Sequence, residues 1–197
     1  MKKVLIARIG YMDFYQGCNN ERPINGGAYN ENAVGHECFN FKKEIDGKCY
    51  GYVRPPVGLN KNRWPKLNIK RIDPNLSQDD GKCVNDVLVI WVATRPKVYG
   101  GGQVVVGWYS GATVFRESQK FPANIDRSLL ENGRYNIVCD SKNAHLLPLG
   151  KRRLEIPQTR NGKKSLGNAN VFYLLDESYN VKKDIAPEIN KAVRFTE

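Results

Sequence analysis

Residues 86–117 read DVLVIWVATRPKVYGGGQVVVGWYSGATVFRE and decide the fold of this chain. The run at 87–93 is almost wholly apolar and rich in β-branched residues, which predicts a strand buried on both faces. Residues 103–109 predict a second strand of the same kind. Arg95-Pro96 and the glycines at 100–102 lie between them and are typical of a turn. The stretch therefore predicts two adjacent strands of one sheet.

The second strand contains Gly107, which Trp108 and Tyr109 follow directly. A glycine inside a strand marks a bulge, a bend or a close backbone approach. Ser110-Gly111 is expected to turn the chain into a third strand at 112–116, which would complete an antiparallel meander. Two interpretations of the aromatic pair stay open. The rings line a pocket in a curled sheet, or they close a core, as buried Trp and Tyr commonly do.

Shorter segments with alternating or apolar patterns, bounded by turn residues, predict further strands. They lie at residues 4–9, 39–41, 48–53, 135–139, 154–157 and 171–175. A short helix is predicted at 125–130, with Asn124 as its N-cap and Asn132-Gly133 at its end. The whole pattern predicts an α+β chain that is mostly β, with a few short helices.

The charge of the chain points to an acidic partner. The formal net charge is +11 and the pI is about 9.5, and nucleic acid is the commonest partner of such a surface. The alternative is a basic surface that binds nothing. We expect phosphate contacts from basic residues in three loop-like stretches. These residues are Lys61, Arg63, Lys151, Arg152, Arg153, Arg160, Lys163 and Lys164.

The cysteine and histidine content predicts neither a metal site nor a redox site. The chain has five cysteines without a CxxC pair and only two histidines. We therefore expect reduced thiols in a reducing compartment. Residues 1–10 are interpreted as the first strand, because Arg8 interrupts the apolar run that a signal peptide would need. No apolar stretch reaches the length of a membrane span, so we expect a soluble, cytoplasmic protein.

The common catalytic signatures are absent from the sequence. Two histidines more than a hundred residues apart, at 36 and 145, do not supply the metal-binding constellation of an HNH nuclease. No Glu-x-Lys follows an acidic residue, and there is no Gly-x-Ser-x-Gly, Walker or GxGxxG motif. We therefore expect that this chain is not an enzyme and that it uses no cofactor or metal.

Several blocks of the sequence carry a resemblance to a known family. They are VVGWY with the following ATVFRE, ARIGYMDFYQG at 7–17, GGAYNENAVGHECFNF at 26–41, GYVRPP at 51–56 and RRLEIPQTRNGKKSLGNANVFY at 152–173. In this order they resemble the N-terminal module of bacterial modification-dependent HNH-type restriction endonucleases. That module is similar in layout to the EVE and YTH domains of the PUA-like superfamily.

The resemblance implies a small curled antiparallel or mixed β-barrel over residues 1–176. Residues 177–197 would be a linker or a C-terminal helix towards a separate nuclease domain. The implied function is recognition of a modified base in double-stranded DNA, as the specificity module of an anti-phage restriction enzyme. Two alternatives stay open, a PUA-like RNA-binding domain and a protein-interaction module that needs no nucleic acid.

The implied mechanism turns the modified base out of the duplex, at a cost of a few kcal/mol. Aromatic side chains would stack on this base, and amides or an imidazole would read its polar edge. His36 and the asparagines each have a purely structural alternative, as a buried histidine or as turn caps. The expected pocket residues are Tyr11, Tyr29, Asn30, His36, Trp108, Tyr109 and Asn170.

Overall fold

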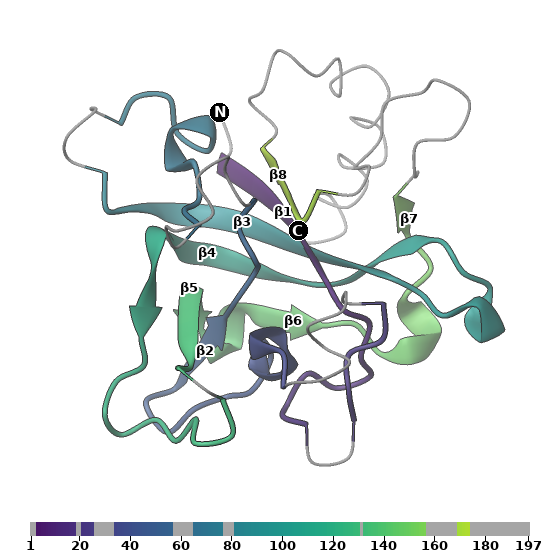
Figure 1. Ribbon diagram of the computed structural model, residues 1–197. Coiled ribbons are helices and arrows are strands. Elements are labelled where there is room, and N and C mark those ends of the chain that lie inside the picture. Colours follow the sequence, from purple (N-terminus) through teal and green to yellow (C-terminus); the bar gives the residue numbers. More distant parts are fainter. Residues whose placement is uncertain are drawn as a thin grey trace.

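The computed structural model describes residues 3–18, 21–25, 34–56, 65–76, 81–130, 132–156 and 169–173. Its core is one mixed sheet of eight strands, drawn in Figure 1. The main path runs in the order β2-β5-β4-β3-β1-β8, while β6 and β7 both pair with β4. Over the described residues the sheet does not close, so the mostly-β prediction is confirmed and a closed barrel is not.

The strands are joined by loops and short 3-10 helices. The strands are β1 (Lys3–Ile9), β2 (Lys48–Gly51), β3 (Cys83–Thr94), β4 (Gln103–Lys120), β5 (Arg134–Asp140), β6 (Ala144–Leu146), β7 (Glu155–Ile156) and β8 (Val171–Tyr173). The 3-10 helices are η1 (His36–Phe39), η2 (Ile69–Arg71), η3 (Lys97–Tyr99), η4 (Ser141–Asn143) and η5 (Leu149–Lys151). In this described part, no helix has both the length and the apolar character to cross a membrane.

The central strand β3 is buried on both faces, as its sequence predicts. Val87, Val89 and Trp91 pack into the larger hydrophobic cluster, whereas Leu88 and Ile90 belong to a second cluster. Successive strand residues point to opposite sides, so the two clusters lie on opposite faces of the sheet. β3 pairs in parallel with β1 and antiparallel with β4.

Aromatic rings fill the larger cluster. The ring centroids of Trp91 and Tyr109 lie 5.3 Å apart, and Phe41 meets Tyr109 edge-on at 5.5 Å. Gly107 makes the predicted close approach, since a Cβ there would lie 2.4 Å from the carbonyl oxygen of His145 and 2.6 Å from Cζ of Phe41. Glycine is therefore required at this position, because β6 and Phe41 pack closely against β4.

The prediction of a turn at Ser110-Gly111 is wrong, because β4 continues through it as one long strand. Between the pairs Val89↔Tyr109 and Val87↔Ala112, β4 contains one residue more than β3. Gly111 has φ +62°, which glycine adopts without strain. The Ser-Gly pair is therefore a bulge that bends the strand and does not reverse it.

The helix predicted at 125–130 is also wrong. This segment forms consecutive turns, in which Ile125 N–H donates to the carbonyl of Pro122 and Leu130 N–H to that of Arg127. The guanidinium of Arg127 is buried in an ion pair with Glu44. It also lies 4.5 Å from the centroid of the Phe39 ring. These contacts draw Arg127 into the interior and prevent a regular helical turn.

Of the strands predicted at 39–41 and 48–53, only the second is present, as β2. Phe39 ends η1, and the remaining pairing is β2 with β5 together with a single bridge between Lys43 and Cys49. The strands predicted at 4–9, 135–139 and 154–157 are present as β1, β5 and β7. Within 171–175, β8 covers 171–173, while residues 174–175 and 177–197 lie outside the described residues.

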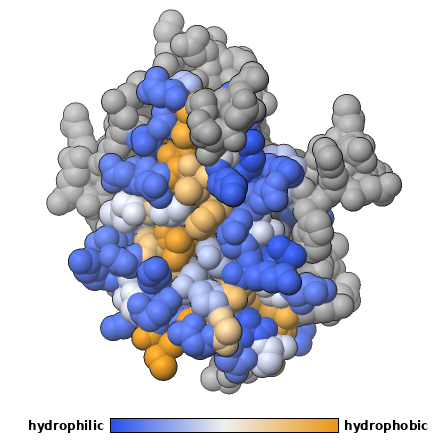
Figure 2. All heavy atoms as spheres, turned by 90° about the vertical axis from the view of Figure 1, so that its left-hand side faces the viewer, coloured by the Kyte–Doolittle hydropathy of each residue, from blue (hydrophilic) through white to orange (hydrophobic). Residues whose placement is uncertain are grey.

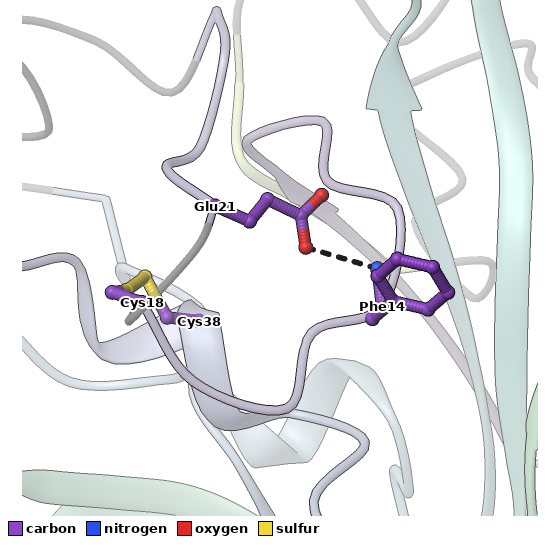
Figure 3. Close-up of a disulfide and its surroundings, with 4 residues drawn as sticks. All are labelled: Phe14, Cys18, Glu21 and Cys38. Atoms are coloured by element: carbon purple, nitrogen blue, oxygen red, sulfur yellow. Dashed lines mark hydrogen bonds between the residues drawn. A yellow bond between two sulfur atoms is a disulfide. The ribbon is translucent and has the colours of Figure 1, made fainter.

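Two of the cysteines form a disulfide, which corrects the expectation that all five are reduced. Cys18 and Cys38 are bonded, with their Cα atoms 6.0 Å apart (Figure 3). The loop that contains Cys18 lies beside η1, where Gly17 N–H donates to the carbonyl of Cys38. Cys49, Cys83 and Cys139 are free thiols. The disulfide ties the loop at 11–18 to η1.

Candidate nucleic-acid interface

Trp108 and Tyr109, the centre of the predicted pocket, lie on opposite faces of the sheet. Tyr109 is fully buried in the larger cluster beside Trp91. Trp108 belongs to the second cluster and is 9% exposed. Neighbouring residues of a strand point in opposite directions, so the two rings do not line one pocket.

Trp108 stacks on the ring of His145, its partner across β4 and β6. The ring centroids are 5.1 Å apart and the planes differ by 27°. His145 is exposed, so it forms the outer layer of this stack. The pair places an aromatic surface at the β6 edge of the sheet.

The other predicted pocket residues that the structure describes lie in separate surroundings. Tyr11 is buried in the larger cluster, on the Tyr109 side of the sheet. Asn170 lies beside β1, where its side-chain oxygen accepts a hydrogen bond of 3.1 Å from Arg8. Tyr29 and Asn30 lie outside the described residues. The predicted residues are therefore not gathered around one cavity.

His36 has the environment of a structural histidine. Its ring lies 4.8 Å from the ring of Tyr52, and its Nδ1 is buried. Burial lowers the pKa of the imidazole, so the neutral form is favoured. A neutral, half-buried imidazole in η1 is suited to packing against Tyr52, directly after β2.

Arg152, predicted to contact phosphate, is a structural residue in the interior. Only 2% of it is exposed. Its guanidinium donates to the carbonyl oxygens of Leu147, Met12 and Asp13 at 2.8, 2.5 and 2.5 Å. Three backbone acceptors occupy the donors that a phosphate would use. Arg152 therefore fixes the loop at 11–18 next to η5 and is not available to DNA.

The neighbours of Arg152 point outward. Lys151 and Arg153 are both exposed, and Arg153 donates to the carbonyl of Gly150 at 2.9 Å. The remaining predicted phosphate contacts, Lys61, Arg63, Arg160, Lys163 and Lys164, lie outside the described residues.

A group of basic residues that the sequence alone does not join meets at one corner of the sheet. Backbone hydrogen bonds of 2.8 Å run from Leu67 N–H to the carbonyl of Arg116 and from Arg116 N–H to that of Lys82. Residues 65–71, 81–83 and 115–117 are thereby brought side by side. We call this group the basic corner. Its members are Lys66, Lys70, Arg71, Lys82 and Arg116.

The acidic residues at this corner are already engaged. Glu117 pairs with Lys66, and Asp73 forms a salt bridge of 3.0 Å with Lys3. The interaction with Lys3 lowers the pKa of Asp73, so this carboxylate stays charged. Positive charge therefore dominates the corner. Lys82 and Arg116 were missed from the sequence because Lys82 directly precedes β3 and Arg116 lies within β4, and neither segment carries a basic run.

The side of the molecule next to this corner carries a hydrophobic band between hydrophilic residues. Figure 2 faces the end formed by β2, β5 and the last part of β4, with hydrophilic residues on both flanks of a hydrophobic band. The half-buried rings of Phe115 and Phe121 belong to this end, and both contact the half-buried ring of Tyr135, with centroids 5.7 and 5.3 Å away. Phe115 directly precedes Arg116, so aromatic and basic residues are interleaved here.

Among the described residues, no group of three or more His, Cys, Asp or Glu side chains is placed to hold a metal ion. Comparisons with protein-family models, with curated proteins and with solved structures found no match. The resemblance to modification-dependent endonucleases therefore rests on its sequence blocks.

Proposed function

We propose that this chain is a DNA-binding module that contacts phosphates through the basic corner and recognises a modified base. Its setting would be the specificity part of a modification-dependent restriction enzyme. The observation that carries the proposal is the convergence of Lys70, Lys82 and Arg116 from three separate segments. A fold gains no stability from gathering like charges, so a polyanionic partner gives this arrangement a purpose.

The energetic basis is counterion release. Each phosphate that a Lys or Arg neutralises frees condensed cations, so affinity falls as salt rises, with a slope of about 0.9 per contact in a double-logarithmic plot. This contribution is independent of sequence. It holds the duplex against the protein while specific contacts form.

Base recognition would use the Trp108–His145 stack. A base turned out of the duplex would replace His145 as the ring that covers Trp108. Stacking of a base on an aromatic ring contributes about 1–3 kcal/mol, which is enough to offset a large part of the cost of flipping. Tyr11 and Tyr109 stay in the core and support the sheet.

The phosphate contacts are tested by measuring DNA affinity across a salt series for a double variant, Lys70→Ala with Lys82→Ala. The slope should fall by about 1.8, from two lost contacts at about 0.9 each. Lys48→Ala with Lys142→Ala removes the same charge at exposed sites elsewhere and should leave the slope nearly unchanged. Equal slopes for the two double variants would show that charge acts only globally.

Base reading is tested with Trp108→Leu on modified and plain duplexes. The variant should lose the preference for modified DNA and retain salt-sensitive binding. Equal loss of both would contradict the assignment of Trp108. Tighter binding to a matched RNA than to either duplex would support the PUA-like RNA-binding alternative instead.

A further inference from the structure

The tip of the β3–β4 hairpin presents two large apolar side chains to solvent. Val98 is 85% exposed and Tyr99 is 60% exposed, both within η3. Lys97 precedes them and is exposed as well. Strand hairpins are usually closed by polar turn residues, so bulky apolar residues at this tip are not explained by the turn itself.

The tip is held in one conformation by several hydrogen bonds. Tyr99 N–H and Gly101 N–H both donate to the carbonyl of Pro96, at 2.9 and 3.1 Å. The side chain of Arg95 reaches across the base of the loop, with Nε donating to the carbonyl of Gly101 and Nη2 to Glu155, at 2.8 and 2.7 Å. A rigid loop loses little conformational entropy on binding. The apolar side chains are thus preorganised for a partner.

The tip belongs to a larger apolar surface. Five of the seven large hydrophobic side chains exposed in the described part of the chain lie in η3, in η5 or in the segments 11–18 and 21–25. Tyr11 connects them, because its ring lies 6.4 Å from Tyr99 and its backbone pairs with Ile24. The five residues are Phe14, Ile24, Val98, Tyr99 and Leu149.

Exposed basic residues lie beside these apolar side chains in the sequence, and two of the acidic residues here, Glu155 and Glu21, are engaged. Lys97, Lys151 and Arg153 are exposed. Glu155 pairs with Arg95, while Glu21 accepts the backbone N–H of Phe14 at 3.0 Å (Figure 3). The surface therefore combines apolar side chains at its centre with positive charge at its rim.

We propose that Val98 and Tyr99 form a wedge that inserts between base pairs of bound DNA and unstacks them. The inference rests on the proposed function and adds the step that opens the duplex. Apolar side chains on a narrow loop are the groups that enter base steps and kink the helix, at a cost of a few kcal/mol per step. The basic rim supplies phosphate contacts that offset this cost.

DNA fits these features better than a flat apolar partner. The tip projects two adjacent side chains from the loop that joins β3 and β4, beyond their last pair, Thr94↔Gln103. Tyr99 offers a ring that stacks on any base without sequence preference. The excess of positive charge over the whole chain is complementary to a duplex.

The test uses a duplex that carries 2-aminopurine, a base whose fluorescence rises when it is unstacked. The full chain should raise the fluorescence, and the double variant Val98→Ser with Tyr99→Ser should lose this rise and bind about tenfold more weakly. The control is Ile45→Ser with Leu129→Ser. Its residues are 85% and 56% exposed on other turns, so it removes a similar apolar surface and should behave as wild type.

Each outcome decides between the two proposals. If the tip variant binds DNA and unstacks it like wild type, the wedge is wrong and the DNA-binding proposal stands. If neither protein binds the duplex, both proposals fail. If the tip variant differs from wild type only in binding to vesicles of anionic phospholipid, the surface serves a membrane and the wedge is again overturned.

Discussion

Trp91 and Tyr99 are eight positions apart in the same hairpin, yet their surroundings are opposite. Trp91 sits in β3 with no exposed surface, among Phe41, Tyr109 and Gly51. Tyr99 sits at the tip and is 60% exposed. Within one hairpin, the ring that faces the larger cluster serves the core, whereas the ring at the tip remains available to a ligand.

The largest expected effect is that of Trp91→Ala. Removing this ring leaves a cavity between Phe41 and Tyr109, and such truncations cost about 3–5 kcal/mol. The free energy of unfolding, measured in urea, should fall by that amount with little change in the m-value. A loss below about 1 kcal/mol would mean that the Trp91 ring does not build the core, which would contradict its contrast with Tyr99.

Arg152 and Arg153 extend the same contrast to basic residues. Arg152→Met leaves the carbonyls of Met12, Asp13 and Leu147 without their donor, at about 1–3 kcal/mol for each buried group that stays unsatisfied. We expect a total loss of about 3 kcal/mol in urea unfolding. Arg153→Met should stay within about 0.5 kcal/mol of wild type, since Arg153 is exposed. Equal effects would contradict the structural assignment of Arg152.

Gly107→Ala should have a moderate effect. The added methyl group meets the backbone of His145 and the ring of Phe41, and overpacking of this kind costs about 1–3 kcal/mol. Gly150→Ala is the matched control, because nothing lies within 4 Å of a Cβ at that position. Thermal unfolding should separate the two variants. A neutral Gly107→Ala would mean that β6 does not press on β4 as described.

The smallest effect on stability belongs to the tip. Val98→Ser with Tyr99→Ser should change the free energy of unfolding by no more than about 0.5 kcal/mol, as expected for exposed side chains. Its effect should appear in DNA binding alone. A large fall in the free energy of unfolding would mean that Val98 and Tyr99 stabilise the fold as Trp91 does, which would contradict the contrast between tip and core.

The sequence predicts the strands well where hydrophobic pattern decides them, as in β1, β3 and β5. It fails where tertiary partners decide. Ser110-Gly111 suits a turn or a bulge equally, and only the continued pairing of β4 with β3 settles the choice. The turn segment at 125–130 depends on Glu44, more than eighty residues earlier in the chain, which captures Arg127 in a buried ion pair.

The site was harder to predict than the strands. The alternation of strand side chains already separates Trp108 from Tyr109, so their placement in one pocket overlooked a signal present in the sequence. Val98 and Tyr99 also carry a visible signal, as bulky apolar residues between a proline and three glycines. Lys82 and Arg116 carry none, because backbone pairing alone brings them to residues 65–71.

Recognition of a modified base is tested by binding of the wild-type chain to matched duplexes, plain and with modified cytosine or adenine, across a salt series. We predict that one modified duplex keeps its affinity as salt rises while the plain duplex loses it, because base contacts are far less sensitive to salt than phosphate contacts. If all duplexes lose affinity together, the chain binds DNA by charge alone, and the claim that it reads a modified base is contradicted.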